Sequence, residues 1–152
     1  MKRLMYFTMC LCTMLLVVSC SKSNSDNPLI GKWEQTIEQA GVKAVATYDF
    51  KDSGKLTQTM VMKNASPAID IDAEGTCEYT YKDNTITFKF SASDFTFNKF
   101  SIEGLSDDMI DAAMEEMKSE MVNMEQSFTN VKIDGDKLTA NFNGQQVELK
   151  RI

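Results

Sequence analysis

Groups able to do catalytic or metal-binding chemistry are scarce in this chain. Its 152 residues contain no histidine, which removes the usual general base, the common activated-nucleophile pairs and the most frequent metal ligand. Asp70, Asp72 and Glu74 stand close together in a stretch, residues 64–75, that we expect to be a long loop. They could bind Ca²⁺, but their spacing is not that of a calcium-binding loop, which favours a solvated loop. We therefore predict no catalytic residue, no metal site and no cofactor.

Methionine is the second group with possible chemistry. Five of the 11 methionines lie between residues 109 and 124. A stripe at intervals of four and three residues, which is the repeat of one helix face, consists of Ile110, Met114, Met117, Met121, Met124 and Phe128. Three interpretations are open: a face packed on the rest of the domain, an adaptable lid over an apolar cavity, or a Cu(I) site with thioether ligands. Packing alone accounts for the spacing and is favoured.

Cys77 and the aromatic residues are the remaining side chains that could react or bind a ligand. No basic cluster adjoins Cys77, so a buried and inert thiol is expected. The aromatic and methionine side chains on the expected inner face either contact a small apolar ligand or fill a solid core, as they do in many small barrels. The candidate ligand-facing residues are Tyr48, Phe50, Met60, Met62, Tyr79, Tyr81, Phe88 and Phe90 on strands, and Met114, Met117 and Met121 on the helix.

Most of these side chains are expected to lie on β-strands. From Leu29 to Phe100 apolar and polar residues alternate at period two, interrupted by turn sequences at residues 51–55 and 82–84. The alternation changes phase between Phe97 and Phe100, which predicts a bulge or turn near Asn98.

One helix and a second group of strands follow. Ser106 is a suitable N-cap, and the stripe predicts a helix over about residues 106–126. Three short alternating runs then follow, separated by the hairpin sequences "DGD" (134–136) and "NG" (143–144). With about eight or nine strands and short links, the pattern predicts one mainly β domain over residues 29–152. We expect a small antiparallel β-barrel with one inserted amphipathic helix.

The first residues do not fit this domain. Lys2 and Arg3 precede an apolar run of about 15 residues, short of the roughly 20 that span a bilayer. The run ends in "LVVSC", which resembles the lipobox of bacterial lipoproteins. The resemblance implies that residues 1–19 are a signal peptide and that Cys20 is lipidated. Residues 20–28 would then form the lipidated cysteine and a flexible tether to a membrane of the bacterial cell envelope.

The charge after such cleavage is strongly negative. Loss of Lys2 and Arg3 leaves 14 basic and 22 acidic residues, a net charge of −8. Such a surface repels phosphate backbones, so nucleic acid is not an expected partner.

Trp33 and Arg151 give the fold a more specific interpretation. Apart from Arg3, they are the only tryptophan and arginine of the chain. "GKW" (Gly31 to Trp33), at the start of the first strand, resembles the G-x-W signature of the lipocalins and related calycin barrels. That resemblance implies a barrel-closing pair in which Trp33 packs against Arg151 of the last strand. The helix departs from the family pattern, because it precedes the last two or three strands instead of following the eighth.

The expected function is binding. The protein resembles small lipocalin-like lipoproteins of Gram-negative envelopes, which implies a membrane-anchored barrel with a small apolar ligand in or at its interior. The alternative is an envelope interaction module with a packed interior and no ligand. An enzyme is disfavoured, and the sequence indicates no particular protein partner.

Overall fold

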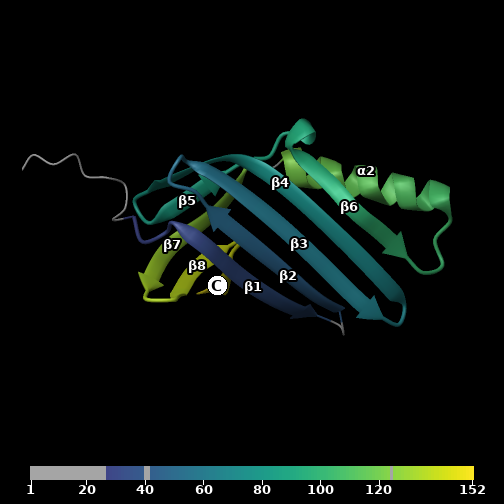
Figure 1. Ribbon diagram of the computed structural model, residues 1–152, viewed down its shortest axis with the longest axis horizontal. Helices are drawn as coiled ribbons and strands as arrows, with labels where there is room; N and C mark the ends of the chain where they lie inside the picture. Colours follow the sequence, from purple (N-terminus) through teal and green to yellow (C-terminus); the bar gives the residue numbers. More distant parts are fainter. Residues whose placement is uncertain (1–26, 40–41, 124) are drawn as a thin grey trace, which may run out of the picture.

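The computed structural model describes residues 27–39, 42–123 and 125–152 (Figure 1). The proposed signal peptide, Cys20 and most of the tether lie outside these residues. Strands occupy Gly31–Gln39 (β1), Val42–Phe50 (β2), Lys55–Ala65 (β3), Ala68–Lys82 (β4), Thr85–Phe88 (β5), Phe95–Ile102 (β6), Gln126–Asp134 (β7), Lys137–Phe142 (β8) and Gln145–Arg151 (β9). The helix is α2 (Asp107–Asn123), and a single 3-10 turn, η2, covers Ala92–Asp94.

Eight strands close into an antiparallel barrel. Around the ring the order is β1-β2-β3-β4-β5-β7-β8-β9, and β9 returns to β1 through the pairs Trp33↔Arg151 and Glu34↔Lys150. β6 lies outside the ring and pairs with the first half of β4, from Ile69 to Gly75. The predicted class, a small antiparallel barrel with one inserted helix, is confirmed.

The predicted turns and bulge lie where the sequence places them. Asp83 and Asn84 link β4 to β5 with φ of 52° and 57°, and Asn143 and Gly144 link β8 to β9 with φ of 49° and 78°. Positive φ at both central residues is the geometry of the hairpin turn that matches strand twist. In β6, the register skips Asn98, because Lys99 opposes Asp72 whereas Phe97 opposes Ala73.

Residues 64–75 do not form the expected long loop. They form the end of β3, a short turn and the first half of β4, in continuous register from Lys55↔Glu78 to Ala65↔Ala68. Asp70, Asp72 and Glu74 alternate with the inward residues of a 15-residue strand. Their charges obscured the alternation in the sequence, although charged side chains on a solvent-facing side are compatible with a strand.

The barrel is closed at one end and opens at the other. β1 pairs with β2 along its whole length, from Gly31↔Phe50 to Gln39↔Val42, but with β9 only at Trp33 and Glu34. Beyond this seam β1, β2, β3, β4 and β6 continue as a sheet that does not close, here called the flared sheet. Figure 1 shows α2 running alongside β6 at this end.

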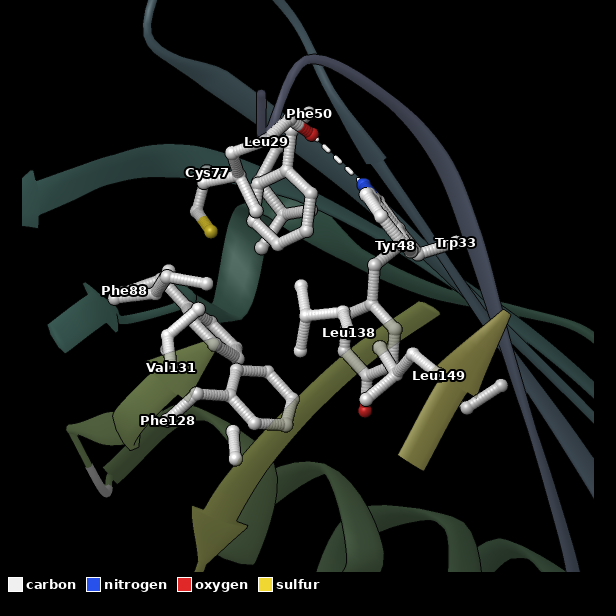
Figure 2. Close-up of a cluster of buried hydrophobic side chains, with 14 of the residues drawn as sticks. Leu29, Trp33, Tyr48, Phe50, Cys77, Phe88, Phe128, Val131, Leu138 and Leu149 are labelled. Carbon is white, nitrogen blue, oxygen red and sulfur yellow. Dashed lines mark hydrogen bonds between the residues drawn. The ribbon is translucent and has the colours of Figure 1, made fainter. Parts of the chain in front are cut away.

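The closed end is solid. Tyr48 meets Phe128 edge to face at 5.3 Å between ring centroids, and Phe128 lies 5.9 Å from Phe88. Leu138 and Leu149 fill the space beside these rings, and all five side chains are buried (Figure 2). Aromatic packing at such distances adds to the stabilisation from burial alone.

Gly75 lies where two phenylalanine rings of the core come close to the barrel wall. A Cβ at this position would lie 2.8 Å from Cδ2 of Phe95 and 2.9 Å from Cδ1 of Phe90. Gly75→Ala is therefore expected to lower the free energy of unfolding by about 1–3 kcal/mol, through overpacking. Urea unfolding measures the loss. Exposed Glu74→Ala is the neighbouring control and should stay within about 0.5 kcal/mol of wild type; equal losses in the two variants would contradict the assigned contact.

Candidate functional site

The inner face of the flared sheet consists of three rows of side chains that adjoin one another across strands. The strand registers define them, and alternation places them on the same side as the buried core. From the open end inward the rows are Ile37–Ala44–Met62–Ile71–Phe100, Gln35–Ala46–Met60–Ala73–Phe97 and Trp33–Tyr48–Gln58–Gly75–Phe95.

Exposure falls from the first row to the third. Ile37 is 43% exposed, Met60 and Met62 are half-buried, and Trp33 is fully buried. β2 and β4 carry small side chains in the second row: Ala46 lies between Gln35 and Met60, and Ala73 lies between Met60 and Phe97. The rows carry apolar or uncharged side chains only, so the face is uncharged from its rim to the core.

The helix presents its predicted face to the protein. Met114, Met117 and Met121 are half-buried, whereas Met109, off the stripe, is 54% exposed. Met121 and Val122 pack against the core, and the helix contacts β6 and η2. Met124, the last methionine of the stripe, lies outside the described residues.

Four of the aromatic candidate residues differ from the methionine candidates in burial. Tyr48, Phe50, Phe88 and Phe90 are almost fully buried and contact other aromatic rings, so they belong to the solid end. Burial also raises the pKa of the Tyr48 hydroxyl, which keeps it neutral.

The half-buried candidate residues fall into two groups, tyrosines that pack on the core and methionines outside the core cluster. Tyr79 packs edge to face on Phe50 and donates a hydrogen bond from Oη to the carbonyl of Lys51 at 3.1 Å. Tyr81 packs on the outer part of the same core. The four strand and helix methionines Met60, Met62, Met114 and Met117 are the half-buried candidates outside the core cluster.

Gln58 is a residue of this face that the sequence interpretation did not single out. It lies in the third row between Tyr48 and Gly75, and it is only 6% exposed. Its Oε1 is buried without a hydrogen-bond partner among the described residues, a situation that costs about 1–3 kcal/mol. A polar residue between Leu56 and Met60, at an inward position, was the signal available in the sequence.

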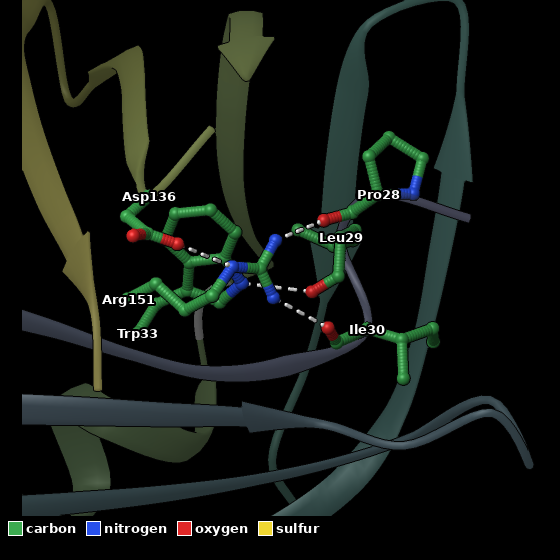
Figure 3. A network of polar contacts seen from close by, with 6 residues as sticks. All are labelled: Pro28, Leu29, Ile30, Trp33, Asp136 and Arg151. Carbon is green, nitrogen blue, oxygen red and sulfur yellow. Dashed lines mark hydrogen bonds and ion pairs between the residues drawn. The ribbon is translucent and has the colours of Figure 1, made fainter. Parts of the chain in front are cut away.

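Trp33 and Arg151 meet at the closed end (Figure 3). The guanidinium carbon lies 4.1 Å from the indole centroid, and Trp33 Nε1 donates to the carbonyl of Leu29 at 2.8 Å. Arg151 donates to the carbonyls of Ile30 (Nη1, 2.8 Å) and Pro28 (Nη2, 2.6 Å). This cation–π contact and these hydrogen bonds hold the chain entering β1 against the end of β9.

The contact between Trp33 and Arg151 also requires a glycine at position 31. Its φ is +122°, and a Cβ there would lie 2.9 Å from Arg151 Nη1. The glycine of the "GKW" sequence thus permits both the backbone conformation and the approach of the guanidinium.

Among the described residues, the groups with possible covalent or metal chemistry are not assembled into a site. Burial raises the pKa of the Cys77 thiol to about 11, so it remains protonated near neutral pH. Asp70 is paired with Lys99, whose hydrogen bond lowers the pKa of that carboxyl. Within residues 27–39, 42–123 and 125–152, no group of three or more Cys, Asp or Glu side chains is arranged to hold a metal ion. The helix of the described chain is not long and apolar enough to cross a membrane.

Comparison with protein-family models gives no match, and comparison with curated proteins gives none either. Among solved structures, the chain is similar to an uncharacterized protein from Bacteroides eggerthii DSM 20697, determined at 2.60 Å resolution. The TM-score is 0.42 and the sequence identity 17%, over 81% of this chain and 98% of that chain.

Proposed function

We propose that this protein is a lipid-anchored, lipocalin-like envelope protein that binds a small apolar ligand at the open end of its barrel. The ligand lies between the inner face of the flared sheet and the methionine face of α2. The observation that carries this proposal is the uncharged inner face, whose side chains on β1, β3 and β6 are partly exposed in the two outer rows and which continues inward to the core.

The packing of the two ends supports this position. The closed end is filled by aromatic rings, so a ligand there would have to displace a well-packed core. At the open end, the outer rows of the sheet combine small residues with the flexible side chains of Met60 and Met62, a combination that adapts to ligands of different shape. The interpretation of α2 as an adaptable lid belongs to this proposal.

Binding of an apolar fluorescent probe, N-phenyl-1-naphthylamine, tests the proposal. The purified domain should bind the probe saturably, and Met62→Gln should weaken binding about tenfold by placing an amide on the apolar face. Met109→Gln makes the same change at an exposed helix position and should leave affinity unchanged.

Absence of saturable binding, or equal affinity in both variants, would contradict a ligand site on this face. The solid core of the closed end would then favour the second candidate, an interaction module with a packed interior. Native mass spectrometry of protein purified from its own host would further distinguish the two, because only a ligand binder should carry a bound small molecule.

A further inference from the structure

One atom of the buried Gln58 carboxamide, Oε1, has no hydrogen-bond partner among the described residues. This atom is shielded from solvent. Rotating the carboxamide by 180° would exchange Oε1 and Nε2 and leave a polar atom at the same place. A ligand group that pairs with this carboxamide must therefore be able to donate or to accept a hydrogen bond, and a hydroxyl does both.

The surroundings of Gln58 connect this polar position to the apolar face. Gln58 adjoins Tyr48 on one side and Gly75 on the other, at the boundary of the solid core. Towards the open end, the next row presents Ala46, Met60 and Ala73. A ligand lying on this face with its end at Gln58 would have a hydrocarbon body against methionine and alanine side chains.

We infer that the site takes a neutral amphiphile, a hydrocarbon chain ending in a hydroxyl group that hydrogen-bonds to the Gln58 carboxamide. This inference rests on the proposed binding function and specifies its ligand class. The polar end enters first and the apolar body lies along Met60 and Met62 of the sheet.

An ionised head group does not fit the same position. None of the three rows contains a lysine or arginine, so a carboxylate beside Gln58 would lose its hydration without gaining a cation. The basic residue of α2 is Lys118, which neighbours the methionine face and is half-buried. Binding of a carboxylate at this helix would therefore be the competing outcome.

Competition against N-phenyl-1-naphthylamine with three ligands of equal chain length tests the inference at neutral pH. The ligands are 1-decanol, its methyl ether, which cannot donate a hydrogen bond, and decanoate. In the wild-type protein 1-decanol should bind about tenfold more tightly than the ether or decanoate. In Gln58→Met, which keeps the side-chain length, the preference for the alcohol over the ether should disappear while the ether still binds.

Gln35→Met is the matched control. Gln35 is the other amide of the inner rows, but it is half-buried and lies one row farther out than Gln58, so the alcohol preference should survive its replacement. Loss of the preference in both variants, or its persistence in Gln58→Met, would overturn the role of Gln58.

The two proposals fail in different ways. If none of the three ligands displaces the probe and the probe itself does not bind saturably, the binding function fails. If all three bind alike in wild type and Gln58→Met, or decanoate binds as tightly as 1-decanol, the binding function stands and the hydroxyl inference is wrong. A buried water already bonded to Gln58 would give this second result.

Discussion

Replacing Trp33 with alanine is expected to lower the free energy of unfolding by about 3–5 kcal/mol. The side chain is fully buried, its Nε1 donates to the carbonyl of Leu29, and its ring contacts the Arg151 guanidinium. The seam that it supports is short: it consists of the residue pairs Trp33↔Arg151 and Glu34↔Lys150 and a hydrogen bond from the Ile152 backbone N–H to the carbonyl of Lys32, so little other pairing compensates. Urea unfolding followed by circular dichroism measures the loss, since the variant lacks the tryptophan needed for fluorescence.

A double-mutant cycle isolates the contact between the two side chains. Arg151→Ala should cost about 1–3 kcal/mol, because the carbonyls of Pro28 and Ile30 lose charged donors and the indole loses its cation. Arg151→Lys should restore only part of this, since an ammonium lacks the planar face and the fork of donors. A coupling energy below about 0.5 kcal/mol between Trp33→Ala and Arg151→Ala would show that the contact contributes nothing.

Cys20→Ala is expected to release the protein from the membrane fraction or to block its processing. The proposed anchor is lipid on this cysteine, and two or more acyl chains give stable attachment where a single chain is marginal. Cell fractionation and the mass of the mature protein measure the effect.

Cys77→Ala is the matched control for the anchor. Cys77 is buried in the barrel, so its replacement should leave membrane partition unchanged. A Cys20→Ala protein that partitions like wild type, with the same mature mass, would refute the lipobox interpretation.

Local signals in the sequence predicted the fold well. Asp83–Asn84 and Asn143–Gly144 specify hairpins because these residues adopt positive φ at low cost, and the two turns have that geometry. The phase change around Asn98 predicted the bulge because side chains alternate strictly along a strand. The half-buried face of α2 follows from the three-and-four spacing of its methionines.

The sequence could not separate a solid interior from a ligand site. Tyr48 and Phe88 have the same type and alternation as residues that line a cavity, and whether they fill the barrel depends on which rings meet across it. Gln58 was missed for a related reason. A polar residue in a strand looks ordinary until both neighbouring strands show that it is enclosed.

The hydrogen bonds from Arg151 to Pro28 and Ile30 also determine at which end of the domain the tether is attached. They hold the start of the domain at the closed end, opposite the end beside α2 (Figure 1). Residues 21–27 can span at most roughly 25 Å. With Cys20 anchored as proposed, the closed end would therefore stay within that distance of the bilayer, and the open end would be the end left free to face the aqueous compartment. Ligand exchange would then occur through water, and the protein would act as an acceptor for amphiphiles already released from a membrane.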